Sequence, residues 1–354
     1  MVEQVYEFKL NAKPVSCERY GNGHINTTYL VVDECGEQYI LQKINKNVFH
    51  DPVSLMSNII LVTDHLRTKV NDLREVLTVI TTKSGEYWYV DKEQEYWRMY
   101  VFVCDSVSFD KATDELFRES AVAFGRFQQL LADFPAQSLV ETIPHFHDTP
   151  YRYETFHQIL KNDPYNLAIN VQKEIDFYLA REEYAKTLSK KQSKGILPYR
   201  VTHNDTKLNN VLFDKRTGKN LCVIDLDTVM PGLSVNDYGD SIRFGASTAA
   251  EDERDIFKVQ LSLSLFEAYT SGYLSACGKS LVPSEIESLR DGAKMMTLEC
   301  GLRFLTDYLS GDVYFHVSRD GHNLDRTRTQ IKLVQDMEKY WDKMQDIIMS
   351  AVSR

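Results

Sequence analysis

The first hundred residues of the chain contain short runs in which apolar and polar positions alternate, a pattern typical of β-strands. Aromatic and β-branched residues dominate these runs, which cover residues 29–32, 39–44, 76–80, 87–90 and 97–103. Asp33–Gly36 separates the first two runs and is a hairpin turn signal. Asp51 and Pro52 then begin a stretch with apolar residues at helical spacing, to about residue 67. The pattern predicts five strands and one helix.

From Thr113 onward the apolar spacing becomes helical and stays so for most of the chain. Helices are expected at about residues 113–131, 150–162, 170–192, 252–276, 283–310 and 324–352. One exception is the stretch 199–227, in which two apolar β-type runs flank a polar loop and a turn. We therefore predict an α+β fold with a small β-rich lobe at 1–104, a hinge at about 98–104, and a larger mainly helical lobe at 105–354.

The polar loop of this stretch reads His203-x-Asp205-x-Lys207-x-x-Asn210, and the second apolar run ends at Asp225. Phosphoryl transfer needs an aspartate for the attacking hydroxyl, oxygen ligands for Mg²⁺, and cations on the phosphates. The order and spacing of Asp205, Asn210 and Asp225 match the catalytic Asp and the two metal ligands of kinases. A single loop Asp is usually solvated, but the whole set on strand, loop and strand is specific. We expect Asp205 to be catalytic and Asn210 and Asp225 to bind Mg²⁺.

A nucleotide site is expected in the β-rich lobe. Gly21 and Gly23 lie in a turn-rich segment where successive backbone N–H groups could cradle phosphate oxygens, although a plain hairpin turn has the same pattern. Lys43, at the end of the second strand, is the candidate contact to the phosphates of ATP. Kinases pair this lysine with a Glu on the next helix, and residues 47–74 contain no Glu. Adenine is expected to bond to the backbone near Tyr100 and Val101.

Composition and charge indicate which partners and which cellular compartment to expect. The 354 residues carry a net charge of −10 with a pI near 5.5, which argues against nucleic acid or an anionic membrane as the main partner. The six Cys are scattered without a Cys-x-x-Cys pair, as in reduced cytosolic enzymes. No apolar run approaches membrane-spanning length, and a secretory signal pattern is missing at residue 1. We expect a cytoplasmic protein, with a monomer as the default.

Four stretches, at 21–26, 39–45, 202–232 and 302–315, are similar to the aminoglycoside phosphotransferase and choline kinase superfamily of small-molecule kinases. The last two stretches most resemble N-acetylhexosamine 1-kinases. The resemblance implies a bilobal protein-kinase-like fold. It also implies ATP-dependent phosphorylation of the anomeric hydroxyl of N-acetylglucosamine or N-acetylgalactosamine to the α-1-phosphate, with ATP and Mg²⁺.

The resemblance also assigns roles to single residues. Asp205 would accept the proton of the sugar O1 hydroxyl, and Lys207 matches a lysine that contacts the γ-phosphate. His24, Arg303 and Tyr314 would bind the sugar. Asp227 would share a strand face with Asp225 if the strand continues, and then touch metal or sugar; a turn residue before Pro231 and Gly232 is the equal alternative.

Four polar residues, one within the stretch 199–227 and three after it, are interpreted as structural. Asp237 and Asp240 would hold the catalytic loop, with Arg243 as an ion partner, and His203 would brace the loop through its backbone contacts.

Two other functions stay open from the sequence. One is another small-molecule kinase of this superfamily, acting on choline, methylthioribose, homoserine or an aminoglycoside. The other is an inactive kinase-like binding module, against which the intact set Asp205, Asn210 and Asp225 argues.

Overall fold

The computed structural model describes residues 2–21 and 25–353. These residues form two compact units. Unit 1 comprises Met1–Ser108, Asp133–Pro144 and Val211–Pro231, and unit 2 comprises Phe109–Ala132, His145–Asn210 and Gly232–Arg354. The sequence pattern suggested one division near residue 104, whereas the structure assigns two later segments to unit 1.

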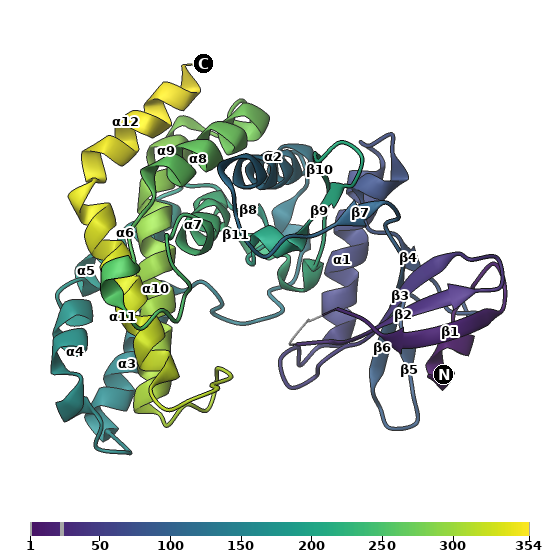
Figure 1. Cartoon of the computed structure of the whole chain (residues 1–354), viewed down its shortest axis with the longest axis horizontal. Helices are drawn as coiled ribbons and strands as arrows, with labels where there is room; N and C mark the ends of the chain where they lie inside the picture. The colour runs from purple at the N-terminus through teal and green to yellow at the C-terminus, as the bar shows by residue number, and fades with distance from the viewer. Residues whose placement is uncertain (1, 22–24, 354) are drawn as a thin grey trace. The chain divides into compact units, whose positions relative to one another are not determined.

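Unit 1 contains an antiparallel sheet with strand order β1-β2-β3-β6-β4, and β5 also pairs with β6 (Figure 1). The strands are β1 (Pro14–Arg19), β2 (Thr27–Asp33), β3 (Gln38–Lys43), β4 (Val79–Ile80), β5 (Tyr89–Val90) and β6 (Tyr96–Val101). The predicted turn between β2 and β3 is confirmed: Asp33 accepts from the N–H groups of Cys35 and Glu37, each at 2.9 Å, and Gly36 adopts φ +82°. The sequence pattern does not predict strand β1 (Pro14–Arg19).

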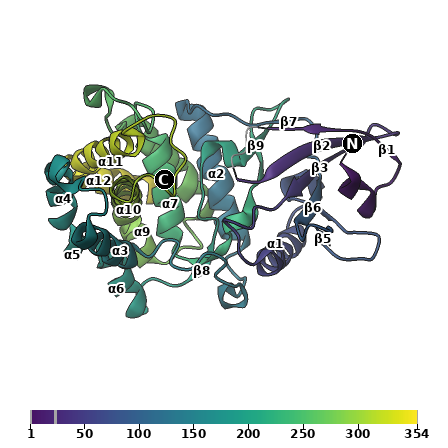
Figure 2. The same cartoon turned by 90° about the horizontal axis from the view of Figure 1, so that it is seen from below.

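The two faces of this sheet differ in chemistry. Val31, Tyr39, Leu41 and Met99 share an apolar face, against which Val5 packs from the 3-10 helix η1 (Glu3–Glu7). The opposite face carries the cross-strand pair Gln42 and Arg98, and here the Arg98 Nη1 lies 4.0 Å from the sulfur of Met56 on helix α1 (Pro52–Arg67). Helix α1 lies near β6 in Figure 2, in agreement with the contact between Met56 and Arg98.

Helix α1 begins where the sequence predicts. The Asp51 side chain accepts from the N–H of Ser54 at 3.1 Å, and Pro52 occupies the first helical position. Asn58, buried on α1, donates to the carbonyls of Val140 and Val229 at 2.7 and 2.9 Å. These two bonds attach the later segments to unit 1.

Unit 1 also holds a three-stranded sheet with order β10-β9-β7. It consists of β7 (Ser106–Val107), β9 (Val211–Asp214) and β10 (Asn220–Val223). Asp214 closes the turn between β9 and β10 by accepting from the N–H groups of Arg216 and Thr217 at 3.0 and 2.9 Å. The two apolar runs predicted around the catalytic loop thus contain strands. The short strand β8 (Arg200–Thr202) precedes the loop in unit 2, and β11 (Met230–Gly232) lies at the unit boundary.

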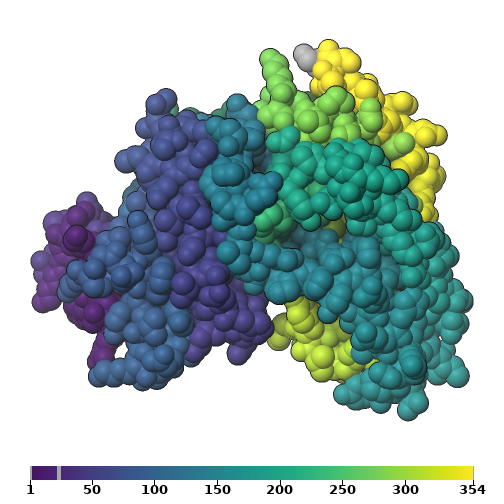
Figure 3. All heavy atoms as spheres, turned by 180° about the vertical axis from the view of Figure 1, so that it is seen from behind, coloured from purple at the N-terminus to yellow at the C-terminus, as the bar shows by residue number. Residues whose placement is uncertain are grey.

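Unit 2 is mainly helical. Its helices are α2 (Asp114–Leu130), α3 (Thr149–Asn162), α4 (Gln172–Leu179), α5 (Glu182–Ala185), α6 (Thr187–Ser193), α7 (Ser234–Gly245), α8 (Leu263–Cys277), α9 (Pro283–Glu287), α10 (Leu289–Leu309), α11 (His322–Lys339) and α12 (Trp341–Val352). Three predicted helices are each divided: 170–192 into α4, α5 and α6, 283–310 into α9 and α10, and 324–352 into α11 and α12. The helix predicted at 252–276 begins later, at Leu263, where the Ser262 side chain caps it. Figure 3 shows the C-terminal helix on the surface.

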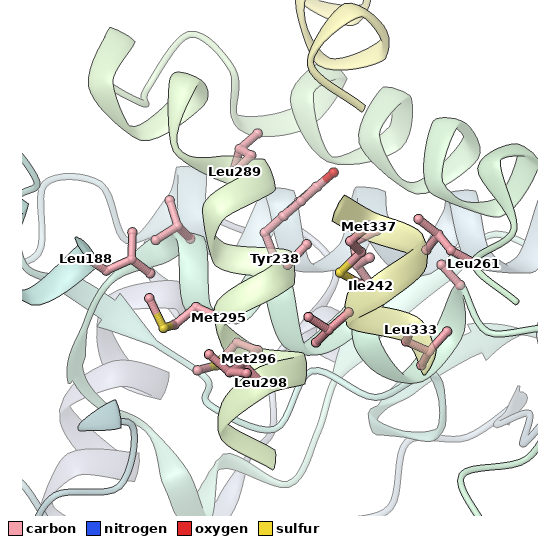
Figure 4. Close-up of a cluster of buried hydrophobic side chains, with 14 of the residues drawn as sticks. Leu188, Tyr238, Ile242, Leu261, Leu289, Met295, Met296, Leu298, Leu333 and Met337 are labelled. Carbon is pink, nitrogen blue, oxygen red and sulfur yellow. The ribbon is translucent and has the colours of Figure 1, made fainter. Parts of the chain in front are cut away.

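The core of unit 2 is built around α10, which packs against α3, α7 and α11 (Figures 1 and 2). Figure 4 shows Leu298 and Met295 of α10 within this cluster, together with Tyr238 and Ile242 of α7 and Met337 of α11. Among the described helices, none combines the length and the apolar composition needed to cross a membrane.

Two glycines set how closely α7 and α10 approach. A Cβ on Gly292 of α10 would collide with the carbonyl oxygen of Val235, and a Cβ on Gly239 of α7 would collide with the carbonyl oxygen of Gly292. Both obstacles are backbone atoms, which cannot move aside by changing a rotamer. Helix α7 also carries Asp237 and Asp240, which are expected to hold the loop at residues 203–210. The close contact between α7 and α10 therefore affects where this loop lies.

We predict that Gly292→Ala lowers the free energy of unfolding by about 1–3 kcal/mol, because overpacking outweighs the better helix propensity of Ala. Urea unfolding followed by circular dichroism measures the change. Gln335→Ala, at an exposed position of α11, is the control and should leave the unfolding midpoint unchanged. A Gly292→Ala protein as stable as the wild type would contradict the close packing.

Candidate active site

The polar loop at residues 203–210, which the sequence predicts to be catalytic, follows β8 and accepts support from the buried carboxylate of Asp237. Asp237 of α7, 2% exposed, accepts from the backbone N–H groups of His203 and Asn204 at 2.8 and 2.7 Å. The side chain of Gln128 donates to Asp237 at 3.1 Å. Burial raises the pKa of Asp237, because desolvation outweighs the stabilisation of the carboxylate by His203 and by the N–H donors. Asn204 adopts φ +64°, a left-handed conformation that Asn tolerates better than most residues.

A second buried carboxylate, that of Asp240, also binds the backbone of the loop. Asp240 accepts from the N–H of Thr206 at 3.2 Å and pairs with Arg243 at 2.9 Å. Burial disfavours the charged form of Asp240, but the cations of Arg243 and Lys207 outweigh it and lower the pKa of this carboxyl. Supporting roles for Asp237, Asp240 and Arg243, as expected from the sequence, are therefore confirmed by these contacts.

His203 is fully buried and braces the loop from inside. Its ring contacts Phe124 and Phe127 edge to face, with centroids 5.4 and 6.0 Å away. Its Nδ1 accepts from the N–H of Asp205 at 3.3 Å. The predicted role of His203 as a brace agrees with this geometry.

The loop brings together three of the predicted site residues, Asp205, Lys207 and Asn210. Lys207 Nζ lies 2.7 Å from Asp205 Oδ1, and Asn210 Nδ2 donates to Asp205 Oδ2 at 3.0 Å and to the Asp205 carbonyl at 2.8 Å. Burial lowers the pKa of Lys207, but Asp205 and Asp240 outweigh this effect, so the net shift is upward. Asn210 uses its amide nitrogen on Asp205, which leaves its amide oxygen as the atom that could bind a cation.

The segment after β10 belongs to unit 1 and carries Asp225 and Asp227. Asp225 adopts a left-handed conformation with φ 61° and ψ 58°, and the 3-10 helix η6 (Leu226–Thr228) follows it. β10 ends at Val223, so the strand does not continue through Asp225 and Asp227, and Asp227 lies in a turn, which was the alternative expectation. The chain turns at Asp225 instead of continuing as a strand. Among the described residues, no group of three His, Cys, Asp or Glu side chains is arranged to hold a metal ion.

Asp227 is 4% exposed and has two partners within unit 1. Its Oδ1 pairs with Arg98 Nη1 at 2.5 Å, and its Oδ2 accepts from Asn26 Nδ2 at 2.5 Å. Asn26 in turn accepts from the N–H of Asn45 at 3.0 Å. One network therefore links the glycine-containing turn, the segment after β3 and the segment that carries Asp225.

Arg98 belongs to this network and is one of the residues that the sequence analysis did not identify. It is 1% exposed, and its Nε donates to Gln42 at 3.0 Å. Burial disfavours its charge, but Asp227 outweighs the burial and raises the pKa of the guanidinium. The sequence contains one indication of this ion pair: an Arg lies at the centre of the apolar run 96–101, where a charge is expected only if it is paired.

Lys43, the predicted phosphate contact, lies at the end of strand β3 in unit 1. Lys43 pairs in register with Trp97, so its side chain starts on the sheet face opposite to that of Gln42 and Arg98. Lys43 forms no ion pair with another described residue, and α1 contains no Glu. A phosphate contact by Lys43 stays a prediction.

Five further predicted nucleotide and sugar positions belong to the glycine-containing segment and to β6. Gly21 adopts φ +71°, as a tight turn requires, while Gly23 and His24 lie outside the described residues. Tyr100 is buried on β6, which raises the pKa of its hydroxyl. The N–H of Val101 donates to the carbonyl of Thr78 at 2.9 Å. An adenine contact would therefore use a different backbone group, and that assignment also stays a prediction.

The structure brings the predicted sugar residues Arg303 and Tyr314 together in unit 2. Arg303 Nη2 donates to the Tyr314 hydroxyl at 3.4 Å, and its guanidinium lies 5.4–5.8 Å from the ring centroids of Phe146, Tyr314 and Phe315. Asp307 holds the loop with Tyr314 by accepting from its N–H at 2.8 Å. Tyr314 is 66% exposed, so part of its side chain is open to a ligand.

Comparison with known proteins supports a common fold. The sequence model of the phosphotransferase enzyme family (APH) matches residues 16–272, more than half of the chain. A microcompartment-associated aminopropanol kinase has a similar structure, with a TM-score of 0.64, 16% identity and 97% of each chain covered. An amicoumacin kinase in complex with AMP-PNP, Ca²⁺ and its ligand follows, with a TM-score of 0.62, 13% identity, and 94% of this chain and 92% of that chain covered.

A choline kinase from Cryptosporidium parvum is similar at a TM-score of 0.55 and 14% identity, over 100% of this chain and 95% of that chain. These structural similarities confirm the kinase-like fold, with an antiparallel sheet in the N-terminal part and a mainly helical C-terminal part.

We predict that Arg98→Met costs about 3–5 kcal/mol in the free energy of unfolding, because it leaves the carboxylate of Asp227 buried without its cation. The double variant Arg98→Met/Asp227→Asn removes both charges and should regain much of that loss. Chemical unfolding of the wild type, both single variants and the double variant measures the coupling. If the two single losses simply add, the ion pair does not have this role.

Proposed function

Because the chain belongs to the phosphotransferase enzyme family, we propose that it is an ATP-dependent small-molecule kinase. We propose further that it phosphorylates the anomeric hydroxyl of N-acetylglucosamine or N-acetylgalactosamine. The kinase activity rests on the family and on the loop at residues 203–210. The choice of substrate rests on the resemblance of residues 202–232 and 302–315 to N-acetylhexosamine 1-kinases, together with the surroundings of Arg303.

The observation that carries the proposal is the arrangement around Asp205. Its carboxylate contacts Lys207 on one oxygen and Asn210 on the other. In this role Asp205 accepts a hydrogen bond from the attacking hydroxyl, orients it and takes its proton as the new P–O bond forms. Lys207, whose raised pKa keeps it charged, would then turn toward the γ-phosphate.

Asn210 and Asp225 have hard oxygen donors of the kind that Mg²⁺ prefers, and we assign the metal to them. When bound, Mg²⁺ neutralises charge on the phosphates during transfer. The backbone of the turn with Gly21 and Gly23, together with Lys43, is assigned to the phosphates of ATP, and Tyr100 and Val101 are assigned to the adenine side.

The acceptor side is assigned to Arg303, Tyr314, His24 and Asp227. Arg303 donates hydrogen bonds that suit sugar hydroxyls or the acetyl carbonyl, and the rings around it supply an apolar wall. Asp227 already uses both oxygens on Arg98 and Asn26, so a sugar contact would require one of these bonds to open.

A second candidate is a kinase of an amino alcohol or an aminoglycoside, favoured by the aminopropanol and choline kinases of similar structure. The charges near the acceptor residues argue against it. Arg303 lowers the pKa of Arg152, after burial as the larger cause, and Glu299 offsets only part of this effect, so two guanidinium groups share this region. A cationic amine would be repelled by these groups, whereas a neutral sugar would not.

A substrate panel separates these candidates. With ATP and Mg²⁺, we expect ADP release with N-acetylglucosamine or N-acetylgalactosamine and little or none with choline, aminopropanol, homoserine, methylthioribose or an aminoglycoside. A coupled ADP assay measures it. Turnover of an amino alcohol without turnover of either hexosamine would refute the hexosamine assignment.

We predict that Asp205→Asn lowers kcat by roughly 10²–10⁴-fold, because the amide cannot take the hydroxyl proton. Sugar binding, measured by calorimetry, should survive. Asp346→Asn changes an exposed carboxylate on α12 in the same way and should leave kcat unchanged. Full activity of Asp205→Asn would remove Asp205 from its role, and a wild type inactive on every acceptor would favour a binding module.

A further inference from the structure

His147 lies between a buried carboxylate and the backbone of the catalytic loop. Its Nδ1 is 2.9 Å from Glu299 Oε1, and its Nε2 is 3.3 Å from the carbonyl oxygen of Asn204. Glu299, on α10, is 1% exposed, and its other oxygen accepts from the hydroxyl of Thr149 at 2.6 Å. All these residues belong to unit 2.

The partners of His147 define its protonation. The Asn204 carbonyl can only accept a hydrogen bond, and the carboxylate of Glu299 also accepts. Both contacts are made together only when both ring nitrogens carry a proton, so the imidazolium fits this position. Burial lowers the pKa of His147, but Glu299 outweighs it and raises the pKa, while the pKa of Glu299 is lowered for the same reason.

The Asn204 carbonyl belongs to the peptide group that leads into Asp205. The N–H of this peptide bonds to His203 Nδ1, and the N–H of Asn204 bonds to Asp237. His147 contacts the carbonyl side of the same peptide. The peptide plane is therefore held from both sides, and its rotation would swing the Asp205 side chain.

We propose that His147 and Glu299 are positioning residues that fix the peptide group before Asp205 and so aim its carboxylate at the acceptor hydroxyl. The proposal rests on the kinase function proposed above. Glu299 lies one helical turn before Arg303 on α10, so the same helix supports the loop and carries the acceptor residue.

The pH dependence follows from the groups that face His147. Besides Glu299, these are Arg303 on the same helix and Asp237 and Asp240 on α7. Because its pKa is raised, His147 stays protonated above the usual range of histidine and loses its proton as pH rises through the shifted value. The bond to the Asn204 carbonyl is lost with that proton, so kcat should fall on the alkaline side.

Two variants separate positioning from general stability. Gln carries its amide nitrogen near the position of the imidazole Nε2, and Asn carries it near Nδ1. His147→Gln therefore keeps the donor to the Asn204 carbonyl, whereas His147→Asn keeps only the donor to Glu299. We expect His147→Asn to lower kcat by roughly 10–100-fold, a loss typical of a misaligned group, with little change in the KM for ATP. His147→Gln should recover most of kcat and lack the alkaline limb that titration of His147 produces.

The matched control is His157→Asn, which removes a half-exposed histidine paired with Glu182 in the same unit. It should retain the wild-type kcat and pH profile. If His147→Asn behaves like this control, or if His147→Gln is as poor as His147→Asn, the positioning role is refuted.

A spectroscopic test does not need activity. Nitrogen-15 NMR of the histidine rings at neutral pH, assigned with His147→Gln, should show both nitrogens of His147 protonated. A neutral His147 with an unprotonated Nε2 would overturn the proposal even in an active enzyme. A doubly protonated His147 in a protein that phosphorylates no acceptor would instead leave the geometry intact and reject the kinase function.

Discussion

The site depends on the buried carboxylate of Asp237 on α7. This single side chain accepts the two backbone N–H groups at His203 and Asn204, and these bonds allow the left-handed turn that presents Asp205. Burying a charge is costly unless it is fully hydrogen-bonded, so the carboxylate and the loop stabilise each other. The close approach of α7 and α10 at two glycines then determines where the loop lies relative to Glu299 and Arg303 within unit 2.

The buried ion pair of unit 1 differs from the one found in protein kinases. Protein kinases pair a strand lysine with a helix glutamate. Here α1 has no Glu, Lys43 starts on the opposite sheet face, and the buried ion pair in unit 1 joins Arg98 to Asp227. Through Asn26 this pair connects the start of β2 to the segment of Asp225, so one network joins the parts of unit 1 to which we assign the nucleotide and the metal.

The sequence was informative where structure is local. Strand alternation, the turn at Asp33–Gly36 and the cap at Asp51 depend on neighbouring residues, and the structure has them where they were predicted. The loop motif identified Asp205, Lys207 and Asn210, which do meet. Arg98, His147 and Glu299 were missed because their partners lie 57 to 152 residues away or in another strand, and their own neighbours give no sign of pairing. Helical periodicity also runs across breaks such as Tyr340, so it could not show that α11 ends there.

We propose that the anomeric hydroxyl of an N-acetylhexosamine is the phosphorylated group, with Asp205 taking its proton. NMR of the product formed from N-acetylglucosamine with ATP and Mg²⁺ tests it most directly. Phosphorus–proton coupling to the anomeric proton, with the small proton coupling of an α linkage, is the predicted result. Phosphate on another hydroxyl, or no product from either hexosamine while an amino alcohol is phosphorylated, would contradict the account.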